Sequence, residues 1–147
     1  MFCFSCAILD SQRHSRPRFY FRNEKGVHMH TNESSENYLE TILILSKQLP
    51  VVRSVAIATE LDFKKSSVSV AMKKLREANH ITVSSEGYIT LTESGREIAE
   101  RIYERHTLLS QWLTRLGVDP MVAADDACRI EHVISSESFE AIKRHIK

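Results

Sequence analysis

The feature that most constrains this fold is a run of two short helical patterns and a hairpin pattern between residues 53 and 91. Apolar residues at helical spacing predict one helix over about 53–61 and another over about 65–79. The short break between them is typical of a helix-turn-helix. Two β-rich runs, 81–84 and 88–91, flank Ser85, Glu86 and Gly87, which is a hairpin signal. A hairpin directly after such a pair predicts a winged helix-turn-helix.

The apolar positions of the two short helices are expected to face inward. They are Val55, Ala56, Ala58 and Leu61 in the first helix, and Val68, Met72, Leu75 and Ala78 in the second. A further helix is predicted before this pair, from about residue 33, with Ser34 or Ser35 as its N-cap and Pro50 beyond its end. Its apolar face is formed by Tyr38, Ile42, Leu45 and Leu49.

Three helices are predicted after the hairpin. The first covers about 93–116, with Ser94 and Glu97 as a capping box and Gly117 at its end. Its apolar stripe is Ile98, Ile102, His106, Leu109, Leu113 and Leu116. Asp119 and Pro120 then open a helix to about 134, and a last helix covers about 136–146. We therefore expect a mostly α protein, a winged helix-turn-helix DNA-binding domain followed by a helical dimerisation domain.

The first 28 residues differ from the rest of the chain. An aperiodic apolar stretch precedes a basic, broken one, which is not the order of a signal peptide. We interpret residues 1–28 as a disordered or spurious extension with Met29 as the true start, 33–92 as the winged helix-turn-helix and 93–147 as the linking helix and dimerisation domain. Three cysteines, two of them in the first six residues, fit a reducing cytoplasm better than a disulfide framework. The longest apolar run in the folded part, residues 42–45, is far too short to span a membrane.

The charge of the second short helix favours contact with nucleic acid. Since the net charge of the chain is only +1, such a role needs a local patch. Polar and basic residues on the outer side of this helix could contact phosphates and bases: Lys64, Lys65, Ser66, Ser67, Ser69, Lys73, Lys74 and Arg76. Val70, also expected to be exposed, could meet a thymine methyl group. The alternative is an ordinary solvated face, but its place in a winged helix favours double-stranded DNA.

A single winged helix reads only a few base pairs, and bacterial helix-turn-helix proteins commonly dimerise to read two half-sites. The helices after the hairpin are too apolar for the surface of a monomer. We therefore expect a homodimer with its interface in these helices.

Three potential metal ligands share one face of the helix predicted over 120–134. Cys128, Glu131 and His132 stand at positions i, i+3 and i+4, and they offer thiolate, carboxylate and imidazole donors. Chance placement on an amphipathic helix is the alternative, with Cys128 as a small core residue. His106 could likewise be a packed core histidine, and Asn37 and Glu40 could be ordinary exposed polar residues. Only a fold that gathers these segments would make one site.

From about residue 35 to 146 the chain resembles the diphtheria toxin repressor family of iron- and manganese-dependent regulators. The matching stretches occur in order, and they are ENYLETI, SSVSVAMKKL, ITLTESGREIAE, ERHTLLSQWL and ACRIEHVIS. The resemblance implies a metal-dependent regulator of metal-uptake genes, with Fe(II) or Mn(II) as co-repressor. It also implies a set of metal ligands, namely Asn37, Glu40, His106, Cys128, Glu131 and His132.

The chain departs from the family pattern at several positions. Asn37 stands where manganese-type members tend to have Asp and iron-type members Met, whereas Glu40 resembles the manganese type and Cys128 the iron type. Ser110 and Ala124 replace ligands of the iron-type ancillary site, so we expect no such site. We also expect a short form without the C-terminal SH3-like domain of larger members.

Three other functions remain open from the residues alone. The first is a winged-helix regulator without metal control, which Asn37 and the missing ancillary ligands favour. The second is a small metal-dependent hydrolase with Glu131 as base, but a catalytic site needs a concave pocket and an open coordination position. The third is a metal-buffering protein, which the basic helix argues against. We expect a regulator and no enzyme.

Overall fold

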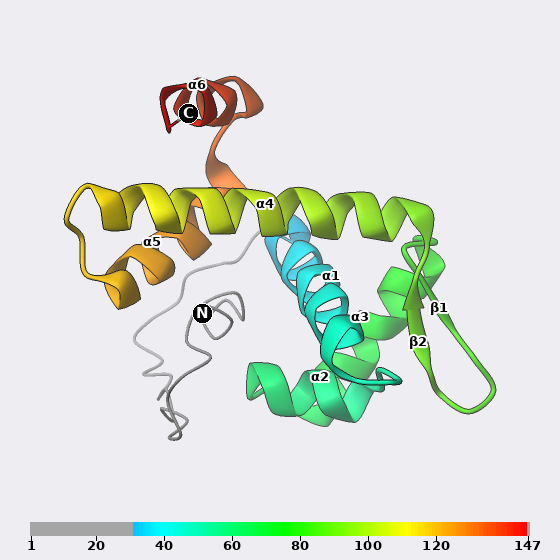
Figure 1. Ribbon diagram of the computed structural model, residues 1–147. Helices are drawn as coiled ribbons and strands as arrows, with labels where there is room; N and C mark the ends of the chain where they lie inside the picture. Colours follow the sequence, from blue (N-terminus) through cyan, green and yellow to red (C-terminus); the bar gives the residue numbers. More distant parts are fainter. Residues whose placement is uncertain (1–30, 147) are drawn as a thin grey trace. The chain divides into compact units, whose positions relative to one another are not determined.

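The computed structural model describes residues 31–146, which fold into helices and one two-stranded sheet (Figure 1). The elements are α1 (Thr31–Gln48), α2 (Ser54–Leu61), α3 (Lys65–Glu77), β1 (Ile81–Val83), β2 (Ile89–Leu91), α4 (Glu93–Arg115), α5 (Pro120–Val133) and α6 (Ser136–Ile146). They divide into an N-terminal unit, residues 31–102, and a C-terminal unit, residues 103–146. The extension predicted for 1–28 and the start predicted at Met29 lie outside the described residues.

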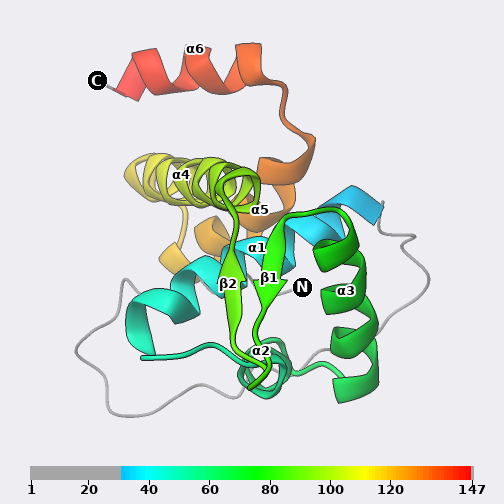
Figure 2. The ribbon, with the colours of Figure 1, turned by 90° about the vertical axis from the view of Figure 1, so that its right-hand side faces the viewer.

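The N-terminal unit is a winged helix-turn-helix, as predicted. Helices α1, α2 and α3 pack together, and strands β1 and β2 pair antiparallel with Ile81 opposite Leu91 and Val83 opposite Ile89. Figure 2 shows this hairpin, the wing, beside α3. Val52, just before α2, joins the edge of the wing through a bridge to Ile89. The wing is therefore anchored to the segment between α1 and α2 as well as to α3.

The buried faces of the short helices correct some predicted inward positions. Ile57, Ala58 and Leu61 are buried in α2, whereas Val55 is 52% exposed because it lies off the side of the helix that these three share. In α3 the predicted Val68, Met72 and Leu75 are buried. Ala78 is exposed because the helix ends at Glu77 and the backbone turns into a left-handed conformation at Asn79. Leu49 is also exposed, so the buried face of α1 ends before it.

Two predicted N-caps are wrong, although the predicted start of α4 at Glu93 is confirmed. Helix α1 begins at Thr31, which places Ser34 and Ser35 inside the helix rather than at its N-cap. At α4 the Oγ1 of Thr92 accepts a hydrogen bond from the backbone N–H of Gly95 at 3.2 Å, so Thr92 is the cap. Ser94 instead donates its hydroxyl to the carbonyl of Asn79 at 3.1 Å. The predicted capping box of Ser94 and Glu97 is therefore not formed.

The C-terminal unit buries its own apolar core. Leu109 of α4, Ala127 of α5 and Phe139 of α6 form its centre. Partly buried apolar residues surround them: Leu108, Trp112, Ile130, Ile134 and Ile142. Leu116 is 64% exposed, so the inward stripe predicted for α4 ends before it. Asp119 caps α5 as predicted, accepting hydrogen bonds from the next turn.

None of the described helices is long and apolar enough to cross a membrane.

Gly95 allows the start of α4 to lie against the loop between α3 and β1. A Cβ atom at this position would stand 1.9 Å from the carbonyl oxygen of His80. That oxygen also accepts a hydrogen bond from the N–H of Thr92 at 3.0 Å, so it cannot move away without breaking a contact. The close approach of two backbone segments therefore requires glycine here.

We predict that Gly95→Ala lowers the free energy of unfolding by about 3 kcal/mol, because the added methyl overlaps a fixed backbone oxygen. Gly117→Ala is the matched control, since its methyl would meet nothing within 4 Å and only its positive φ of +95° would be strained. We expect the control to lose about 1 kcal/mol. Urea unfolding followed by circular dichroism measures both. A smaller loss for Gly95→Ala than for Gly117→Ala would contradict the close approach.

Candidate metal centre and DNA-binding surface

Three potential metal ligands meet inside the C-terminal unit. His106 comes from α4, and Cys128 and Glu131 come from successive turns of α5. One donor atom of each lies within 4.8 Å of the others. All three side chains are buried, with Glu131 fully inaccessible. The packing of α4 on α5 thus brings together residues more than twenty positions apart in the sequence.

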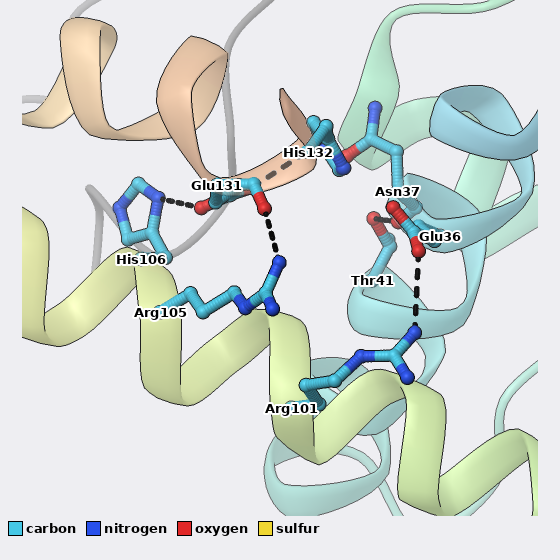
Figure 3. Close-up of polar contacts among 8 residues, drawn as sticks. All are labelled: Glu36, Asn37, Thr41, Arg101, Arg105, His106, Glu131 and His132. Carbon is cyan, nitrogen blue, oxygen red and sulfur yellow. Dashed lines mark hydrogen bonds and ion pairs between the residues drawn. The ribbon is translucent and has the colours of Figure 1, made fainter. Parts of the chain in front are cut away.

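The carboxylate of Glu131 lies between two imidazoles (Figure 3). Its Oε2 is 2.8 Å from Nδ1 of His106, and its Oε1 is 3.4 Å from Nε2 of His132. A buried carboxylate is costly unless it is paired with donors or a cation. The arrangement therefore supplies a partner for the Glu131 charge, and it leaves nitrogen, oxygen and sulfur donors close together.

The donor set fits a divalent transition metal. Zinc-like ions bind thiolate, imidazole and carboxylate atoms at about 2.0–2.3 Å, so two ligands of one tetrahedral ion stand about 3.3–3.8 Å apart. The donor atoms here lie within 4.8 Å of one another, so they would draw together around an ion. A mixture of thiolate, imidazole and carboxylate suits late first-row divalent ions. His106, Cys128 and Glu131 could therefore hold one ion between α4 and α5.

The other predicted ligands, Asn37 and Glu40, lie one turn apart on α1, in the N-terminal unit. Both side chains are buried, with exposed fractions of 2% and 1%, so the alternative that they are ordinary exposed residues is wrong. The Oδ1 atom of Asn37 is buried without a hydrogen-bond partner among the described residues. A buried amide oxygen without a partner is unfavourable, and it is a suitable donor to a cation. The ligand role of Asn37 and Glu40 stays a prediction.

Helix α3 presents the predicted DNA-binding residues on its outer side. Its Val68, Met72 and Leu75 are buried, and the remaining positions are polar, basic or small. The exposed members of the predicted set are Lys64, Lys65, Ser66, Ser67, Ser69, Val70, Lys73 and Lys74. The hydroxyl of Ser69 donates to the carbonyl of Lys65 at 2.9 Å, so within the free protein its proton is used by its own helix.

The start of α3 is suited to an anion. The N-cap is Lys64, which makes no side-chain cap hydrogen bond, and the first turn contains no acidic residue. The first N–H groups of a helix and its dipole favour negative charge, which is why phosphates bind at such ends. Two lysines and two serines at this end add donors that a phosphate can accept from.

A groove of about 280 Å³ separates α3 from the wing. It is lined by Ser54, Ser69, Met72, Lys73, Arg76, Val83, Gly87 and Ile89. Beside it, the guanidinium of Arg53 lies 4.8 Å from the centre of the Tyr88 ring. Arg53 was not predicted as a site residue, because its place in the sequence indicates only the start of a helix. Its contact with Tyr88 fixes a positive charge next to the wing.

The wing turn itself carries a negative charge. The hydroxyl of Ser85 donates to Oε1 of Glu86 at 2.6 Å. This hydrogen bond is the main cause that lowers the pKa of Glu86, and backbone and Ser84 hydrogen bonds and the charge of Arg53 act in the same direction. The turn is therefore anionic at neutral pH, which makes α3 rather than the wing turn the side suited to phosphates.

A winged helix-turn-helix joined to a helical unit with a buried cluster of potential metal ligands defines a class of metal-responsive DNA-binding regulators. Comparison with known proteins agrees. Residues 30–89 match the family profile "Iron dependent repressor, N-terminal DNA binding domain". Residues 92–147 match "Iron dependent repressor, metal binding and dimerisation domain". The chain belongs to the iron-dependent repressor family, which confirms the resemblance found in the sequence.

Individual relatives support this assignment. The chain is 33% identical over 114 residues to an uncharacterized helix-turn-helix transcriptional regulator of Methanocaldococcus jannaschii, covering 76% of this chain and 91% of the relative. It is 34% identical over 112 residues to the transcriptional regulator MntR of Bacillus pumilus, covering 76% and 78%. These relatives are transcriptional regulators, as is the family, so the hydrolase alternative is wrong.

A solved structure also resembles the chain. A manganese-dependent transcriptional repressor in complex with manganese matches with a TM-score of 0.69 and 27% identity. The match covers 76% of this chain but 51% of that repressor, so the chain spans about half its length.

We predict that Cys128 binds a metal through its thiolate. Anaerobic Co(II) should give a thiolate-to-cobalt charge-transfer band in the near ultraviolet, and Cys128→Ser should abolish that band because a hydroxyl is a poor ligand for such ions. Absorption spectroscopy during a Co(II) titration measures it.

The matched control is the double variant Cys3→Ser/Cys6→Ser, which removes the other two thiols of the chain. It should keep the band. A band that persists in Cys128→Ser and disappears in the control would assign the thiolate to the first six residues instead.

Proposed function

We propose that this protein represses metal-uptake genes by binding double-stranded DNA as a homodimer, with Fe(II) or Mn(II) as co-repressor. The observation that carries the proposal is the buried cluster of His106, Cys128 and Glu131 within the domain that the family uses for metal binding and dimerisation. The manganese complex of the similar repressor supports manganese, whereas the thiolate of Cys128 favours softer ions. A protein that acts on promoters is expected in the cytoplasm.

The proposed ligands are the six that the family resemblance implies: Asn37, Glu40, His106, Cys128, Glu131 and His132. Two observations support the α1 members of this set. Glu40 and Asn37 are both buried, and the Asn37 amide oxygen has no hydrogen-bond partner among residues 31–146. When bound, the metal would supply a positive charge that compensates the buried carboxylates among its ligands.

The proposed DNA contacts are those of α3, with Lys64, Lys65, Lys73 and Lys74 at phosphates and with Ser66, Ser67, Ser69 and Val70 near base edges or the backbone. The exposed side of α3 and its uncapped, acid-free start support them. A dimer would place two such helices on two half-sites.

The proposed switch couples metal to the conformation that binds DNA. Ligands on α1 belong to the DNA-binding domain, and ligands on α4 and α5 belong to the dimerisation domain. An ion held by both would restrict their relative motion, and DNA affinity would rise only as far as the ion prefers the DNA-competent arrangement.

We predict that Mn(II) or anaerobic Fe(II) raises the affinity for promoter DNA of metal transporters by about tenfold or more, or about 1.4 kcal/mol of coupling free energy. Glu131→Gln should remove this gain, because it deletes the central carboxylate while keeping its size. Fluorescence anisotropy at constant salt, with chelator and then with metal, measures both.

Tight DNA binding in chelator that no metal changes would contradict the switch. It would support the alternative of a winged-helix regulator without metal control, which the neutral amide at position 37 keeps open.

We predict that Lys64→Ala/Lys65→Ala weakens DNA binding for all sequences alike. Each lost phosphate contact should reduce the slope of log affinity against log salt concentration by about one. Arg115→Ala is the control, because Arg115 is an exposed cation at the end of α4 in the C-terminal unit. An unchanged salt slope in the double variant, or an equal change in the control, would contradict the assignment of α3 to the phosphates.

A further inference from the structure

Arg105 is a buried cation whose partners lie at the end of the metal-ligand helix. Its side chain is 9% exposed, and it precedes His106 on α4. Its Nη1 donates to the backbone carbonyl of Glu131 at 3.1 Å and to that of Ile134 at 3.2 Å. Its Nη2 donates to the Oγ of Ser136 at 3.0 Å. One guanidinium therefore joins α4, the end of α5 and the start of α6.

These contacts satisfy groups that the helix leaves open. The last carbonyls of an α-helix have no partner within it, and a buried carbonyl without a donor is costly. α5 ends at Val133 with Ile134 as its C-cap, so the carbonyls of Glu131 and Ile134 are among these open groups. A planar guanidinium can reach both of them and a third acceptor at once, which the ammonium of a lysine cannot do in the same geometry.

The position of Glu131 depends on the backbone that Arg105 holds. The Glu131 side chain is fully buried, so its carboxylate has little room to adjust if the end of α5 moves. Its Oε2 lies 2.8 Å from Nδ1 of His106, the residue next to Arg105 (Figure 3). The same stretch of α4 therefore provides one ligand and anchors the backbone of another.

We propose that Arg105 is a positioning residue of the metal centre, which holds the end of α5 so that Glu131 faces His106 and thereby couples the docking of α6 to metal binding. The inference rests on the proposed metal site. The guanidinium also lies 5.5 Å from the centre of the Phe139 ring, and Phe139 is the buried residue of α6 in the core of the unit. A displacement of α6 would therefore move Arg105, and through it the backbone of the proposed ligand Glu131.

A second cation on the same ring provides a matched control. Nζ of Lys143 lies 5.9 Å from the centre of the Phe139 ring and pairs with Glu104 of α4. It holds α6 against α4, as Arg105 does, but within residues 31–146 its hydrogen bond and ion pairs are with Glu104 and Glu140 and not with α5. Lys143→Met therefore removes a cation that docks α6 and leaves the carbonyls of α5 with their donor.

The test compares Co(II) binding by the full chain and by Arg105→Met, Arg105→Lys and Lys143→Met, with folding checked by circular dichroism. We expect Arg105→Met to lose about ten- to a hundredfold in Co(II) affinity, which is typical when a group that orients a ligand is removed. The cobalt absorption spectrum of the saturated variant should also change, because the ligand geometry differs. Lys143→Met should keep the affinity and the spectrum of the unmodified protein.

If Arg105→Met does not fold, Arg105→Lys tests the positioning role instead. It keeps the charge but not the planar fork, so it should show the same direction of change in affinity and spectrum.

Hydrogen exchange measures the coupling between α6 and the metal centre. Co(II) should slow amide exchange in α6 of the unmodified protein and not in the Arg105 variants.

A folded Arg105 variant with unchanged Co(II) affinity and spectrum would overturn the inference and leave Arg105 as a stabilising residue only. Unmodified protein that binds no Co(II) would overturn the proposed metal centre itself, which is a distinguishable result.

Discussion

The contact between the His106 imidazole and the Glu131 carboxylate is the constraint on which the C-terminal unit depends. A carboxylate with no solvent exposure is costly unless donors or a cation compensate it, and here two imidazoles and the packing of α4 on α5 surround it. Apolar residues of similar volume would commonly be more stable at such positions. A polar cluster in an otherwise apolar core is therefore better explained by a ligand than by stability, and the family assignment agrees with that explanation.

The N-terminal unit meets a different requirement, since a surface for DNA has to be locally basic in a chain of almost neutral net charge. Backbone contacts hold its parts together: Val52 bridges to Ile89, and Gly95 lets α4 start against the carbonyl of His80. Most of its lysines lie on the exposed side of α3 and Arg53 adds a positive charge beside the wing, whereas the wing turn carries the anionic Glu86. The distribution of charge therefore favours α3 over the wing turn as the contact for phosphates, whereas the net charge of the chain does not distinguish the two.

The sequence predicted the parts of this structure that depend on neighbouring residues. The winged helix-turn-helix followed from short-range spacing, and Cys128 and Glu131 followed from one helical face. The cap of α4 was mispredicted because the choice of Thr92 depends on tertiary contacts with Asn79, thirteen positions away. His106 became a candidate only through the family resemblance, since its neighbours come from another helix. The role of Arg105 could not be predicted from the sequence. Two of its partners are backbone carbonyls, which every residue has, so these contacts leave no pattern of residue types.

The open start of α3 has a consequence for the free protein. Because Lys64 does not cap the helix, the first turn of α3 lacks a stabilising contact that a serine or aspartate would provide, typically worth about 1 kcal/mol. In the proposed complex a phosphate of DNA would supply that contact, so the first turn of α3 would gain this stabilisation only when DNA is bound. A capping residue at position 64 would then make the free protein more stable and would compete with the proposed phosphate contact.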